Sequence, residues 1–244
     1  MSPAATARLF AAVDPPPAVC RELASWARAV SGSLRAGGAW PVAEGATVRL
    51  LDPGTMHVTL CFLGVRPVEE IEALGGALDS CASEAGELSL GAPLWLPPSN
   101  PRSLALEIHE REGRLGRLQQ ELSRAFALAV DWEPERRRFK AHVTVARLGR
   151  GKQGARRGAR GRRRGRAGGG MGEGAEAAAE AGAQAPPAPT PQLSFVPAAV
   201  VLYRSWLSPQ GASYEPVATC ALTGAASSSS STSSLEGEEG AGAP

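Results

Sequence analysis

The sequence predicts an α+β fold in which two similar lobes face each other across a cleft. Two nearly identical tetrapeptides, His57-Val-Thr-Leu and His142-Val-Thr-Val, lie 85 residues apart and suggest one copy in each lobe. Short apolar runs typical of β-strands alternate with runs whose apolar residues recur at helical spacing. Hydrophobic residues make up 43% of the chain, which is enough to build a core around these elements.

The first part of the chain reads as a strand, a helix and two further strands. Residues 8–13 form an apolar run, and the prolines at 15–17 suit the first turn of a helix that extends to about Leu34. Two strands, 47–51 and 56–63, are separated by an Asp-Pro-Gly turn, and the second strand carries the first tetrapeptide.

The rest of the predicted domain repeats this alternation. Apolar residues on one face predict a helix from Pro67 to about Leu78, and a second such pattern covers roughly 113–130. The remaining apolar runs predict strands at 88–96, at 103–108, from the second tetrapeptide to Leu148, and at 193–196, 199–206 and 214–222.

Both tetrapeptides place an imidazole and a hydroxyl side by side. Residues i and i+2 of a strand share a face, so His57 lies beside Thr59 and His142 beside Thr144, while the intervening valines turn toward a core. A single His-x-Thr is commonly structural, but two copies in a chain with only three histidines indicate a shared function. The third, His109, has charged neighbours and is expected at the surface.

The paired residues suit chemistry at a phosphodiester. Imidazoles with a pKa near ~6.5 can act as acid and base in one reaction at neutral pH. Two hydroxyls can donate hydrogen bonds to the non-bridging phosphate oxygens. One histidine would deprotonate the nucleophile and the other would protonate the leaving oxygen, with no cofactor and no metal required.

Composition divides the chain into one catalytic domain and two segments without a core. Residues 1–149 plus 192–222 form the predicted domain, and the 150–191 insertion and the 223–244 tail are expected to be disordered. The formal net charge of +2 hides nine basic residues and no acid between Arg150 and Arg166. This run could bind RNA non-specifically, act as a nuclear address, or be an unselected expansion.

The four cysteines form neither a Cys-x-x-Cys pair nor a zinc-like spacing with histidine, which indicates free thiols in a reducing compartment. No stretch approaches the ~20 apolar residues of a membrane span. Strand-like sequence from Arg8 onward leaves no room for a leader peptide. We expect an intracellular protein located in the cytoplasm, with the nucleus as an alternative location. We also expect a monomer with no membrane contact and no obligatory protein partner.

Four segments together resemble a known family, and they cover nearly all of the part expected to be ordered. They are Arg8-Leu-Phe, His57-Val-Thr-Leu-Cys-Phe-Leu-Gly, Phe139-Lys-Ala-His-Val-Thr-Val-Ala-Arg and Leu202-Tyr-Arg-Ser. The sequence resembles the two-histidine (2H) phosphoesterases, and within them the RNA 2′,3′-cyclic phosphodiesterase branch, historically called 2′-5′ RNA ligase.

The resemblance implies a bilobal fold in which two antiparallel β-sheets, related by a pseudo-twofold axis, line a central cleft with helices outside. It implies hydrolysis of an RNA 2′,3′-cyclic phosphate end to a 2′-phosphomonoester, with reversible 2′-5′ ligation as the opposite direction. It makes His142 the base and His57 the acid, although the near-symmetric motifs themselves leave these roles open. Thr59 and Thr144 would hold phosphate oxygens.

Arg147 matches an arginine that contacts substrate in the family. Strand alternation places it on the face opposite His142 unless the strand twists or bulges. The same alternation sends Phe62 to the core and Cys61 to the cleft. Relatives often have proline where this chain has Ala141, and many carry a tryptophan that the 104–108 strand lacks, which leaves base preference open.

Other functions remain compatible with the sequence. The same mechanism could act on a small cyclic phosphate or on a 2′-5′ oligonucleotide, or the protein could be an RNA-binding protein that uses its arginine-rich loop. The basic cluster 136–140, just before the second tetrapeptide, is either a solvated loop or an electrostatic funnel for a polyanion.

Overall fold

The computed structural model describes residues 5–35, 47–81, 84, 86–149, 188–208 and 211–223. The predicted disorder of 150–187 and of the tail from 224 concerns residues outside these ranges and stays a prediction. Residues 188–191 are described, and the carbonyl of Ala188 accepts a hydrogen bond from the indole of Trp26 at 3.3 Å.

The described elements largely follow the predicted order. The helices are α1 (Pro17–Arg35), α2 (Ile71–Ser80) and α3 (Arg114–Ala129), with short 3₁₀ turns η1 (Pro53–Thr55) and η2 (Val68–Glu70). The strands are β1 (Thr6–Val13), β2 (Val48–Leu50), β3 (Val58–Pro67), β4 (Leu88–Leu96), β5 (Ser103–Glu110), β6 (His142–Leu148), β7 (Ser194–Phe195), β8 (Ala199–Ser208) and β9 (Gly211–Ala221).

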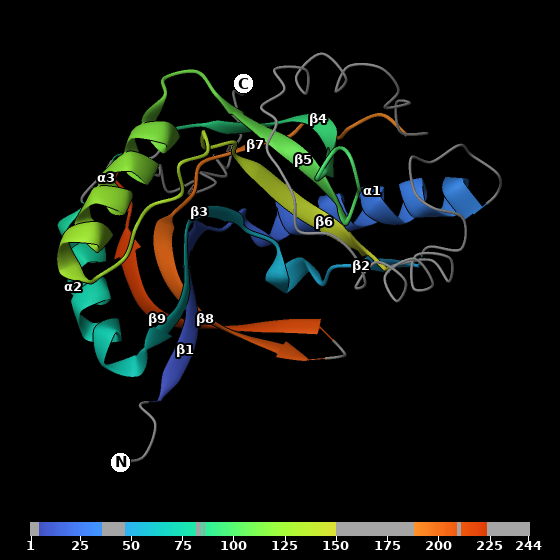
Figure 1. Ribbon diagram of the computed structural model, residues 1–244. Coiled ribbons are helices and arrows are strands. Elements are labelled where there is room, and N and C mark those ends of the chain that lie inside the picture. Colours follow the sequence, from blue (N-terminus) through green and yellow to red (C-terminus); the bar gives the residue numbers. More distant parts are fainter. Residues whose placement is uncertain are drawn as a thin grey trace, which may run out of the picture.

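The strands form one curved antiparallel sheet with an internal symmetry (Figure 1). Their order is β7-β4-β5-β6-β3-β1-β8-β9, with β2 paired to the other part of β6. From β3 toward one edge of the sheet there are three further strands, and from β6 toward the other edge there are also three. This arrangement confirms the predicted α+β fold with two related halves. The halves are continuous rather than separate sheets, because β3 and β6 pair through Val58 and Val143. We call them the β1 half and the β5 half.

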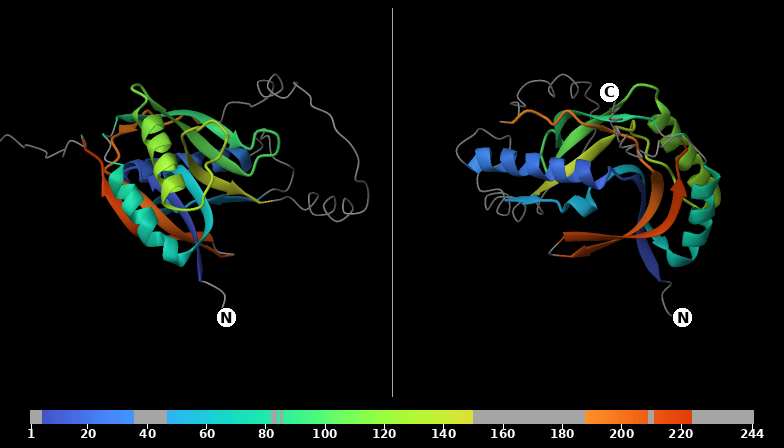
Figure 2. Two further views of the ribbon diagram at one scale, coloured as in Figure 1. Left: turned by 60° about the vertical axis from the view of Figure 1, so that its left-hand side comes forward. Right: turned by 180° about the vertical axis from the view of Figure 1, so that it is seen from behind.

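The helices cross between the halves (Figure 2). Helix α1 follows β1 in the chain but packs against β6 and β2 of the β5 half. Helix α3 follows β5 but packs against β3 of the β1 half, together with α2. The apolar faces of α1 and α3 are fully buried in one common core, for example at Leu23, Val30, Leu122 and Phe126. Within the described residues, none of the helices combines the length and the hydropathy that a membrane span requires.

Each motif strand contains a β-bulge shortly after its threonine. In β6, Thr144 pairs with Ala105 and Ala146 pairs with Leu104, so Val145 is the extra residue. Both Val145 and Ala146 are fully buried, although neighbours in a regular strand point to opposite faces. The register of β3 against β1 shifts in the same way between Thr59 and Cys61.

Candidate active site

The two tetrapeptides meet at the boundary between the halves. Val58 and Val143 lie opposite each other and are fully buried, which anchors both strands to the core. When this antiparallel register is continued by one residue in each direction, His57 lies opposite Thr144 and Thr59 lies opposite His142 on the neighbouring strand. Because neighbouring residues alternate between faces, all four polar side chains lie on the face away from the core.

The backbone holds both imidazoles in the same way. Nδ1 of His57 lies 3.0 Å from the carbonyl oxygen of Thr55, and Nδ1 of His142 lies 2.9 Å from that of Lys140. A carbonyl oxygen only accepts hydrogen bonds, so Nδ1 carries the proton in both rings. In the neutral form of each ring, Nε2 then has the lone pair and is left to exchange a proton with a ligand.

These four residues share one cleft of about 310 Å³. Its walls come from both halves and consist of Leu51, Thr55, His57, Thr59, Leu96, Pro97, Arg102, Ser103, His142, Thr144, Arg147 and Tyr214. Two of these residues are arginines and none is an aspartate or glutamate. The cleft therefore has the donors and the positive charge that an anionic ligand such as phosphate requires.

Arg147 lies in this cleft because of the bulge in β6. The extra residue at Val145 reverses the alternation, so that Arg147 returns to the face of His142 and pairs with Ser103. The exposed guanidinium is close enough to His57 to disfavour the charged form of its imidazole. The alternative in which alternation directs Arg147 away from the cleft is therefore wrong.

The corresponding bulge in β3 corrects a second expectation. Cys61 was expected at the cleft but is buried, and its thiol lies 3.3 Å from the hydroxyl of Ser123 on α3. Phe62 was expected in the core but is 40% exposed. In the symmetry of the two strands, Phe62 occupies the position that Arg147 has in β6. The two bulges thus place a cation at one of two equivalent positions and an aromatic ring at the other.

An aromatic cluster surrounds the ring of His57. Its centroid lies 4.7 Å from that of Phe10 and 5.2 Å from that of Tyr214, and the Tyr214 ring meets it edge-on. Tyr203 stacks on Phe10 and donates a hydrogen bond to Asp14 at 2.5 Å. Sequence reasoning missed Tyr214, because a lone tyrosine on a late strand gives no sign of its neighbours. Tyr203 lies within the family pattern but not in the cleft lining.

This surrounding changes the acidity of His57. Burial among the rings lowers its pKa to about 4, and the charges of Arg147 and His142 act in the same direction. The hydrogen bond to the Thr55 carbonyl opposes the shift but is the weaker effect. The imidazole of His57 is therefore neutral at pH 7.

His109 lies outside this site, as the sequence predicted. Its imidazole is 60% exposed and lies 3.5 Å from the carboxylate of Glu107 on β5. Among the described residues, no group of three or more histidine, cysteine, aspartate or glutamate side chains is arranged to hold a metal ion.

Comparison with solved structures defines the structural class. The crystal structure of E. coli LigT complexed with 3′-AMP superposes with a TM-score of 0.61 at 22% identity, covering 90% of this chain and 99% of LigT. TT0787 of Thermus thermophilus gives 0.57 at 23% identity, covering 88% of this chain and 97% of its own. A structure described as a phosphoesterase gives 0.59 at 22% identity, covering 90% and 99%.

The fold is therefore that of E. coli LigT and of the solved phosphoesterase structure, as the resemblance of the paired motifs implied. At this level of identity, the similarity establishes the fold. No family model and no curated protein matches the sequence.

Proposed function

We propose that this protein hydrolyses RNA 2′,3′-cyclic phosphate ends to 2′-phosphomonoesters by paired histidine acid–base catalysis without a metal ion. The observation that carries the proposal is the cleft in which two imidazoles, two threonines and Arg147 converge without any carboxylate. Joining of the same end to a 5′-hydroxyl through a 2′-5′ bond is the reverse reaction at this site.

Crystals of E. coli LigT, which shares the fold, contain 3′-AMP, ATP or phosphate. These ligands support a phosphate or nucleotide ligand for the present cleft. Thr59, Thr144 and Arg147 would bind the non-bridging oxygens of the cyclic phosphate. This arrangement would hold phosphorus between the two Nε2 atoms and align water for in-line attack.

In the proposed reaction, Nε2 of His142 takes a proton from water as the water oxygen forms a bond to phosphorus. The bond between phosphorus and the 3′ oxygen breaks, and protonated His57 gives its Nε2 proton to that oxygen. Burial lowers the pKa of His57 to about 4, so the ring must gain this proton as the anionic substrate binds. A negative phosphate beside the ring favours that protonation.

Replacing either histidine tests the proposal. His57→Ala and His142→Ala should each lower turnover of a dinucleotide 2′,3′-cyclic phosphate by roughly 10²–10⁴-fold, the usual effect of a positioned acid or base. Chromatography of the product would show which hydroxyl keeps the phosphate. Retention of nearly full activity in both variants would exclude the mechanism.

Two controls accompany this experiment. His109→Ala removes the third histidine, which lies at the surface outside the cleft, and should leave turnover unchanged. Incubation with EDTA should also leave the rate unchanged. Loss of activity on chelation, restored by a divalent cation, would instead indicate metal-assisted hydrolysis.

A further inference from the structure

A second hollow adjoins the candidate active site. Its volume is about 300 Å³, and it shares Thr59, Leu96 and His142 with the cleft. Its remaining walls come from β3, from α3 and from the segment 131–140 that connects α3 to β6. We call this hollow the arginine groove. A ligand bound at the two histidines can therefore continue into the groove without leaving the protein surface.

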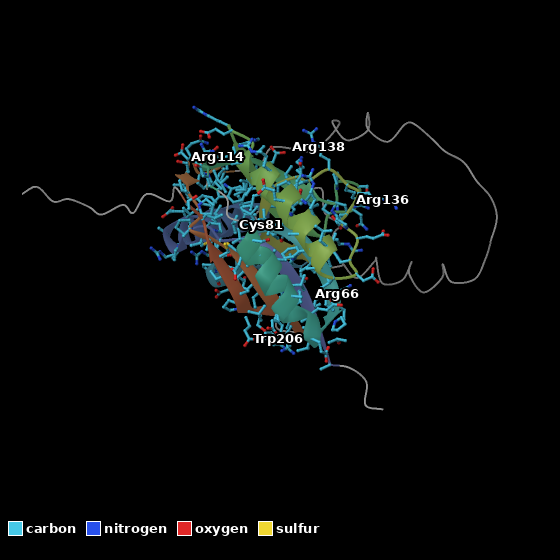
Figure 3. The ribbon with its side chains drawn as sticks, turned by 90° about the vertical axis from the view of Figure 1, so that its left-hand side faces the viewer. Arg66, Cys81, Arg114, Arg136, Arg138 and Trp206 are labelled. Atoms are coloured by element: carbon cyan, nitrogen blue, oxygen red, sulfur yellow. The ribbon has the colours of Figure 1, made fainter. Side chains whose placement is uncertain are left out.

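Positive charge gathers along the groove. Arg137 and Arg138 line it, and Arg136 precedes them on the same exposed segment. Figure 3 labels Arg136 and Arg138. Within the described part of the chain, none of these three arginines forms an ion pair. Lys140 differs, because its ammonium lies 2.9 Å from the carboxylate of Glu107. The arginines are thus available to an external anion, and Glu135 is the carboxylate in the lining.

Aromatic side chains also line the groove. Phe62 is 40% exposed, and the guanidinium of Arg8 lies 4.6 Å from the centroid of its ring. Trp132 and Phe139 line it from the segment before β6. Trp132 is supported from behind by an edge-on contact with the buried Phe126 at 6.4 Å. Phe62 is thus exposed, and Trp132 and Phe139 are partly buried. Aromatic rings combined with unpaired cations are the features by which proteins bind single-stranded nucleic acid.

We propose that the arginine groove binds the RNA chain that leads to the cyclic phosphate, so that the substrate is an oligonucleotide end rather than a small cyclic phosphate. The inference rests on the proposed function for the orientation of the RNA, since the terminal phosphate must lie between the histidines. A mononucleotide would fill the cleft and leave the groove empty. The backbone phosphates of a longer chain would pair with Arg137 and Arg138, while its bases stack on Phe62 and on the accessible parts of the other two rings.

A direct binding measurement tests how much the arginine groove contributes to RNA affinity, separately from turnover. The probe is a fluorescent eight-nucleotide single-stranded RNA ending in a 2′-phosphate, titrated with full-length protein by fluorescence anisotropy over a range of salt concentrations. The variant is Arg137→Ala/Arg138→Ala. The matched control is Arg21→Ala/Arg28→Ala, which removes the same charge from the exposed face of α1 on the β5 half. The basic run between Arg150 and Arg166 is the same in all three proteins.

The groove variant should bind the RNA about tenfold more weakly at low salt. The slope of log affinity against log salt should fall by about 1.4, because each contact to a single-stranded phosphate contributes about 0.7. The control variant should bind like the wild type, and a competing mononucleotide 2′-phosphate should bind all three proteins equally. Equal RNA binding by the wild type and the groove variant, or equal weakening in the control, would overturn the inference.

The outcome also separates the inference from the proposed function. A protein that binds RNA through Arg137 and Arg138 but hydrolyses no cyclic phosphate would contradict the proposed function alone. A protein that hydrolyses cyclic phosphates but binds RNA without these arginines would contradict the groove alone.

Discussion

The residue with the most unusual surroundings is His57. It immediately precedes the first residue of β3, its Nδ1 donates to the Thr55 carbonyl, and Phe10 and Tyr214 cover its ring. His142 has the equivalent backbone hydrogen bond, but that bond is exposed, whereas the one made by His57 is partly buried. The two motifs are therefore alike in sequence and unlike in environment, which is the condition under which one imidazole can be acid and the other base.

Titration of His57 by NMR tests this environment. In the free protein its pKa should be about 4, and saturation with inorganic phosphate should raise it, because a neighbouring anion stabilises the imidazolium. Arg147→Ala should also raise the pKa in the free protein, since it removes a positive charge near the ring. A free-protein pKa near 6.5 that phosphate does not change would contradict the proposed arrangement.

At the scale of elements, the decisive features are the two bulges. One extra residue in β6 brings Arg147 into the cleft, and the equivalent shift in β3 buries Cys61 and exposes Phe62. Regular alternation predicts the His-x-Thr faces correctly because those residues precede the bulges. It fails immediately afterwards, because a bulge depends on the register of the partner strand and no single strand specifies it.

Thiol alkylation checks the bulge in β3. Burial raises the pKa of Cys61 to about 11, which leaves roughly 100-fold less thiolate at neutral pH than an ordinary thiol would have. Native protein treated with iodoacetamide should therefore be modified at the partly exposed Cys220 long before Cys61. Peptide mass spectrometry would measure both rates, with Cys220→Ser as the control. Equal rates at the two cysteines would place Cys61 at the surface and remove the bulge.

At the scale of the whole molecule, the two halves depend on each other. The sheet is continuous through Val58 and Val143, and α1 and α3 each cover the half that they do not belong to by chain order. The exposed cleft is thus built on a single core. The site residues come from both halves, so a protein without either half would lack one of the two histidines.

This interdependence predicts that the halves unfold together. Variants that retain only Trp26, on α1, or only Trp132, after α3, report on the two halves separately. Urea unfolding followed by fluorescence should give the same midpoint and slope for both, and should coincide with the loss of far-UV circular dichroism. Separate transitions would show that each half has a core of its own.

The sequence by itself determined the local features: strand and helix order, the amphipathic faces, and two His-x-Thr pairs whose hydroxyls and imidazoles share a face. These depend on side-chain spacing along one segment, and periodicity reports spacing directly. Only the tertiary structure decided that Arg147 joins the cleft, that Tyr214 lies against His57, and that an arginine groove opens beside His142. Those relations join segments that are distant in the chain, and they follow from strand register and helix crossing, which no local pattern contains.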